Sequence, residues 1–172
     1  MKNVNQLRRI RFWLALFTAG LILSGITAFP LQTELPWLVK LLHISAVEPL
    51  ARSTHLLAWI ERVDGSVEST GSSYPFLFYG TDWLAFAHLA IAVAFVGPWI
   101  DPVRNKWVIT FGLIACAGVV PLALVAGHYR GIPLPWRMID CSFGIVGAIP
   151  LAICRRAIRV LECAEPRASP IN

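Results

Sequence analysis

The chain has 172 residues, of which 56% are hydrophobic and 15% are charged, and its formal net charge is +5. Soluble domains carry about a quarter charged residues, so this composition argues against a soluble globular domain. The net positive charge could suggest a nucleic-acid partner, but the basic residues gather beside apolar segments, and we expect no nucleic-acid binding.

Four apolar runs dominate the chain, at residues 12–29, 83–100, 107–126 and 138–154. A bilayer core is crossed by ~20 helical residues, with ~17–25 as the working range, and all four runs fall within it. Buried helices of a soluble protein are the alternative, but four such runs leave too little polar surface in so short a chain. The sequence therefore predicts an all-α, polytopic membrane protein, in which a four-transmembrane-helix bundle forms a single membrane domain over residues 1–172.

The basic residues are distributed unevenly around these runs. Ten of the fifteen lie before the first run, between the second and third, or after the fourth, and five lie in segments 30–82 and 127–140. Because cytoplasmic loops are enriched in Lys and Arg, both termini are predicted to be cytoplasmic, and these two segments are predicted to lie outside. The first run could instead be a cleavable signal peptide, but it exceeds the roughly 7–15 apolar residues typical of one, which favours an uncleaved helix.

The outer segment 31–78 predicts a short amphipathic helical cap on the outer side of the bundle. Apolar residues recur at helical spacing on both sides of Pro49, which fits two short helices lying on the membrane surface. Residues 64–66 and 69–73 are polar and predict loops. Residues 165–172 predict a flexible tail.

Small residues and prolines inside the runs predict how the helices pack. Gly144, Ala148 and Ala152 recur at four-residue spacing in the fourth run, a pattern that lets helix backbones approach closely in lipid. Pro121 and Pro150 each free a backbone carbonyl, so kinks are predicted in the third and fourth helices.

The four cysteines show no CxxC or other metal-binding spacing, and they are interpreted as small packing residues. No metal site is predicted from them. No catalytic motif is recognised in the sequence, which favours a non-enzymatic protein.

Six ionisable residues are predicted to form one polar layer at the outer ends of the helices. They are Asp82, His88, His128, Arg130, Arg137 and Asp140. Ionisable groups inside a bilayer are costly and therefore functional candidates, and His88 is the one that lies clearly within a run. Positions 82 and 88 are about 120° apart on an ideal helix, so Asp140 is the better candidate for a carboxylate partner of His88.

Three kinds of chemistry remain open for this layer. His88 and His128 could ligate a haem or a metal, although they differ in depth and the cofactor is unknown. Arg130 and Arg137 could bind a small anion or a headgroup, or could simply snorkel to lipid headgroups. His88 and Asp140 could relay protons, or His88 could make an internal hydrogen bond that specifies packing.

Residues 79–88 (YGTDWLAFAH) and 130–144 (RGIPLPWRMIDCSFG) resemble stretches of small uncharacterised bacterial integral membrane proteins. The resemblance covers residues 79–160, with a weaker echo at 23–30. It implies a location in the bacterial inner membrane and carries no activity.

The sequence therefore predicts a non-enzymatic accessory or small-ligand-binding membrane protein that acts at the outer face. Its expected partners are the lipid bilayer and either other membrane subunits or an anionic small ligand or headgroup. The alternative is a membrane redox or transport protein that uses His88 and the outer polar layer.

Overall fold

The computed structural model describes residues 2–164, and their regular structure is helical throughout. Four helical segments are long and apolar enough to cross a membrane: Val4–Ala28, Pro75–Ile100, Lys106–Tyr129 and Leu134–Cys163. The predicted all-α fold with four such helices is thus confirmed, whereas the tail predicted at 165–172 lies outside the described residues. The segments are longer than the apolar runs because their first and last turns carry polar residues.

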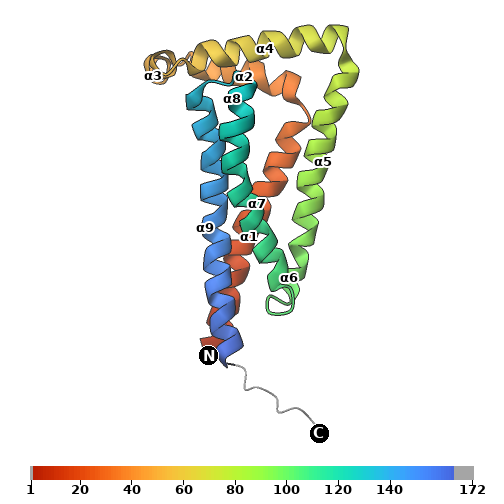
Figure 1. Ribbon diagram of the computed structural model, residues 1–172, viewed down its shortest axis with the longest axis vertical. Coiled ribbons are helices and arrows are strands. Elements are labelled where there is room, and N and C mark those ends of the chain that lie inside the picture. The colour runs from red at the N-terminus through yellow and green to blue at the C-terminus, as the bar shows by residue number, and fades with distance from the viewer. Residues whose placement is uncertain (1, 165–172) are drawn as a thin grey trace.

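The helical elements follow one another along the chain with short connections. They are α1 (Lys2–Ala28), α2 (Leu31–Leu42), α3 (Glu48–Ser53), α4 (Leu56–Ser73), the 3₁₀ helix η1 (Pro75–Phe78), α5 (Tyr79–Ala94), α6 (Val96–Ile100), α7 (Lys106–Pro121), the π-helical turn η2 (Leu122–Ala126), α8 (Gly127–Tyr129) and α9 (Leu134–Ala164). The end of the molecule where α2, α3 and α4 lie is called the cap end, and the end where α1 begins and α9 finishes is called the terminal end (Figure 1).

The long helices pack in the order α5, α1, α9, α7, so that α1 contacts both α5 and α9. Helix α6 follows α5 at the terminal end, where it contacts both α1 and α7. Most of the largest fully buried side chains also gather in that half, among them Ile10, Phe95, Ile109 and Leu151. The core therefore holds the helices together near the terminal end.

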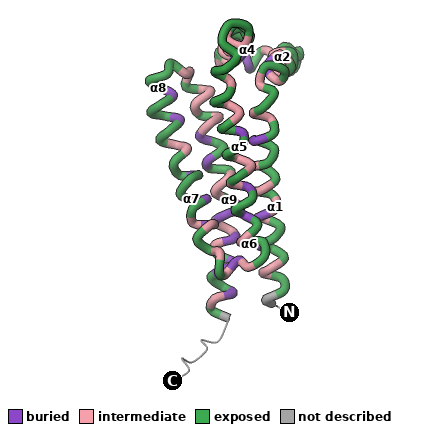
Figure 2. Tube along the Cα trace, turned by 90° about the vertical axis from the view of Figure 1, so that its right-hand side faces the viewer, coloured by how far each residue is buried: buried purple, intermediate pink, exposed green. Residues whose placement is uncertain are grey.

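Buried positions follow the lines where the long helices meet, and most of the remaining surface is exposed (Figure 2). Many exposed positions on these helices carry large apolar side chains, such as Phe86, Val93, Phe143 and Val146. Exposed apolar patches of this extent are unusual on soluble monomers and are typical of surfaces that meet lipid or a partner.

Helices α7 and α9 pack together more extensively than the other described helix pairs, and small residues allow their backbones to approach closely. A methyl group built on Gly144 would lie 2.5 Å from the carbonyl oxygen of Cys116 and 3.1 Å from Cβ of Val119. Gly144 thus has no room for a side chain, as the spacing of small residues in this run predicted.

The two helix prolines differ in their effect. The α-helical part of α7 ends at Pro121, and a π-helical turn follows at once in η2. Proline lacks the N–H that would bond to the carbonyl of Ala117, so the helical ladder is interrupted immediately before this turn. Helix α9 by contrast continues through Pro150 to Ala164.

The cap is a pair of helices, α2 and α4, that pack against each other and lie across the cap end of the long helices (Figure 1). The short helix α3 connects them and packs against α4. Gly71 of α4 has no side chain where the amide of Gln32 from α2 lies against it, which allows the two helices to meet closely.

The loops predicted at residues 64–66 and 69–73 were wrong, because α4 continues through both segments to Ser73. Serine hydroxyls donate to carbonyls one turn earlier, with Ser66 bonded to Arg62 at 2.7 Å and Ser69 bonded to Ser66 at 3.1 Å. These bonds satisfy the polar side chains within the helix, so its serines and glycines do not end it.

Candidate functional site

The six residues predicted to form one polar layer all belong to elements that reach the cap end, but they fall into two groups. Asp82 and His88 lie on α5, whereas His128 lies on α8, Arg130 follows it, and Arg137 and Asp140 lie on α9. Helix α1 separates the groups, and no extensive packing joins α5 to α7 or α9 within the described chain.

His88 makes its hydrogen bond within its own helix. Its Nδ1 lies 2.8 Å from the carbonyl oxygen of Leu84, and because a carbonyl can only accept, Nδ1 carries the proton. The half-buried ring has no hydrogen bond to another helix among the described residues. His88 therefore neither pairs with Asp140 nor ties two helices together through this bond.

The two histidines considered for a haem or metal site are not in contact with each other in the described part of the chain. His88 and His128 come from α5 and α8, which share no extensive contact in the described part of the chain. His128 is exposed, and its ring meets Tyr129 edge-on at 5.9 Å between centroids. Across residues 2–164, no three His, Cys, Asp or Glu side chains gather closely enough to hold a metal ion.

Arg137 joins α9 to the π-helical turn. Its Nη1 donates to the carbonyl oxygen of Leu124 at 3.2 Å. Its methylene groups pack so closely against Gly127 that a Cβ atom built on this glycine would lie 2.7 Å from Cδ of Arg137. A π-helical turn disturbs the regular backbone ladder, and the guanidinium satisfies one of its carbonyls. This contact gives Arg137 a structural role, whereas Arg130 is exposed and forms no ion pair with any described residue.

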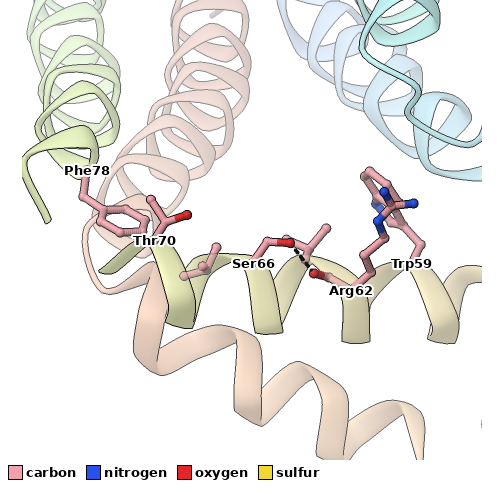
Figure 3. A pocket seen from close by; sticks show the side chains of 7 residues that line it. Trp59, Arg62, Ser66, Thr70 and Phe78 are labelled. Atoms are coloured by element: carbon pink, nitrogen blue, oxygen red, sulfur yellow. Dashed lines mark hydrogen bonds between the residues drawn. The ribbon is translucent and has the colours of Figure 1, made fainter. Parts of the chain in front are cut away.

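A pocket of about 310 Å³ lies along α4, on the side that faces the long helices (Figure 3). Its lining comes from α4 and η1 and consists of Trp59, Arg62, Val63, Ser66, Val67, Thr70 and Phe78. Phe78 closes one end, pointing toward Thr70, while Trp59 and Arg62 stand at the other (Figure 3). The pocket therefore lies between α4 of the cap and the ends of the long helices.

The lining combines apolar walls with a few polar groups. The hydroxyl of Ser66 donates to the carbonyl of Arg62 at 2.7 Å, so it is already satisfied. The side chain of Arg62 has no ionic or aromatic partner among the described residues, in contrast to the other two cations of the cap. Arg52 pairs with Glu48 at 2.6 Å, and Nζ of Lys40 lies 5.3 Å from the centroid of Trp37.

The pocket residues were missed from the sequence, although a signal for them exists. Their positions on α4, at 59, 62–63, 66–67 and 70, recur with the period of a helix. That stripe was obscured because residues 64–66 were interpreted as a loop.

A polar cluster at the other side of the cap joins α2, α3 and α4. Nε2 of His43 lies 3.1 Å from a carboxylate oxygen of Glu61, and its Nδ1 lies 3.8 Å from one of Glu48. Glu48 also binds Arg52, and the hydrogen bond from this guanidinium holds the pKa of Glu48 below its ordinary value. The cluster therefore links the end of α2 to α3 and α4.

Comparison of the chain with protein-family models, with curated proteins and with solved structures found no match. The function is therefore inferred from the pocket, the charges and the arrangement of the helices.

Proposed function

We propose that this chain is a multi-pass protein of the bacterial inner membrane that acts without catalysis, by holding a small ligand beneath its cap at the outer face. Both termini are cytoplasmic in this proposal. Two observations support it. Four helices are long and apolar enough to span a membrane and expose large apolar side chains, and basic residues are in excess at the terminal end.

The observation that carries the ligand-binding role is the pocket along α4. Ligand pockets are typically ~300–1,000 Å³, mostly apolar and equipped with a few polar groups that orient the ligand. The α4 pocket, at about 310 Å³, has this composition. Its lining holds no His, Asp, Glu, Cys or Lys, and its serine donates to a backbone carbonyl instead of facing a base. This favours binding over catalysis.

The orientation can be tested with one introduced and one natural cysteine. Ser45 is exposed in the turn after α2 at the cap end, and the exposed Cys163 lies near the end of α9. In intact cells, a membrane-impermeant maleimide is expected to label Ser45→Cys, and Cys163 only after permeabilisation. Labelling of Cys163 alone in intact cells would reverse the orientation and place the pocket in the cytoplasm.

Occupancy of the pocket can be tested by native mass spectrometry of the protein released from phosphatidylethanolamine–phosphatidylglycerol nanodiscs. Val67→Trp fills the pocket, whereas Val47→Trp adds the same bulk to an exposed turn of the cap. We expect a bound species on the wild type and on Val47→Trp that is lost from Val67→Trp. If the wild type carries no bound species, or if Val67→Trp retains it fully, the ligand-binding role is refuted.

A further inference from the structure

We infer that the ligand beneath the cap is a phospholipid, whose phosphate binds Arg62 and whose acyl chain begins along Trp59, Val63 and Val67. This inference rests on the proposed function and names the class of ligand that the α4 pocket holds.

The position of the pocket matches the depth of lipid phosphates. Helices α2 and α4 lie across the ends of helices that are long enough to span a bilayer (Figure 1). The ends of spanning helices lie at the polar headgroup region, so a helix laid across them runs along the interface. Exposed apolar side chains of the cap, including Trp37, Leu41 and Leu50, are typical of helices that rest at this depth.

The charges of α4 are segregated around its axis. At about 100° per residue, the α4 residues that line the pocket fall within an arc of about 140° that begins at Arg62. The acidic residues Glu61, Asp64 and Glu68 fall about 200–260° from Arg62, on the opposite side. The pocket side of α4 therefore carries one cation and no carboxylate, and this charge complements a phosphate.

The side chains of the pocket suit the two parts of a lipid. A guanidinium binds phosphate oxygens through paired N–H donors, and Arg62 stands at one end of the pocket beside Trp59. Trp59, Val63, Val67 and Phe78 offer the apolar contact that a free phosphate would leave unused. The volume of about 310 Å³ is small, so the pocket holds the phosphate and the start of a chain while the rest of the lipid stays in the bilayer.

The inference is tested with the full-length protein in detergent, titrated with dioctanoyl phosphatidylglycerol and, in parallel, with inorganic phosphate. Native mass spectrometry counts the bound molecules. We expect the lipid to bind the wild type, and Arg62→Gln to weaken its Kd on the order of tenfold, because a charge-assisted hydrogen bond is lost. The control Arg52→Gln removes a cation that pairs with Glu48 outside the pocket, and it should bind like the wild type.

The outcomes separate this inference from the proposed function. Unchanged lipid binding by Arg62→Gln, or inorganic phosphate binding as tightly as the lipid, overturns the phospholipid assignment. A nanodisc-derived species that Val67→Trp abolishes but whose mass is not that of a phospholipid also overturns it, and leaves the ligand-binding role in place.

Discussion

Replacement of Gly144 by alanine tests the packing of α7 against α9. The new methyl group would lie 2.5 Å from the carbonyl oxygen of Cys116, and real contacts of this kind stay above 3.0 Å, so the backbones must separate. Forcing an extra methyl into a packed interface costs about 1–3 kcal/mol. The exchange also gains about 0.5–1 kcal/mol of helix propensity, so we expect a net loss of about 0–2.5 kcal/mol in the free energy of unfolding relative to the wild type.

The assay is reversible unfolding in mixed micelles of dodecyl maltoside and increasing sodium dodecyl sulfate, followed by circular dichroism. Gly118→Ala is the matched control, because Gly118 lies on α7 and a methyl group there would meet no heavy atom within 4 Å. It is expected to be at least as stable as the wild type. The close approach of α7 and α9 would be refuted if Gly144→Ala unfolded at the same detergent fraction as Gly118→Ala.

Three further perturbations test the cap, the π-helical turn and the separation of the polar residues. The hydrogen bond from Arg52 lowers the pKa of Glu48, so the stabilisation that Glu48 gives the cap is complete above the ordinary value of 4.5 and is lost as the pH falls below it. Glu48→Gln should therefore abolish the acid sensitivity of amide hydrogen exchange in α3. An unchanged pH profile in this variant would contradict the prediction. Arg137→Gln should lower the unfolding free energy by about 1–3 kcal/mol in the mixed-micelle assay, since it removes the charge-assisted hydrogen bond to the carbonyl of Leu124; a neutral effect would argue against that contact. His88→Ala and Asp140→Asn should be additive within about 0.5 kcal/mol in a double-mutant cycle, because their helices do not pack together, and a larger coupling energy would show that the two side chains meet.

Much of the fold was determined by the sequence itself. Hydropathy and run length are local properties, and they located all four long helices and the helical cap. The boundaries were less accurate, because hydropathy fades in the polar turns at the helix ends: α9 begins at Leu134 and ends at Ala164, whereas the apolar run covers 138–154. The serine-rich end of α4 was missed for a related reason, since composition does not reveal that hydroxyls such as that of Ser66 bond back to the helix.

The tertiary structure alone decided which polar residues meet. The distribution of charges predicted that the six candidate residues lie at one depth in the membrane. Depth does not specify which side of its helix a residue occupies or which helices lie next to it. The order α5, α1, α9, α7 separates His88 from Asp140 and gives Arg137 to a backbone carbonyl. The α4 pocket likewise requires that helix to lie across the others, because only this placement turns the helical stripe that contains Trp59 and Arg62 toward the long helices. Helix formation depends on residues a few positions apart, whereas a site depends on contacts between distant segments, and these are set by how the helices pack.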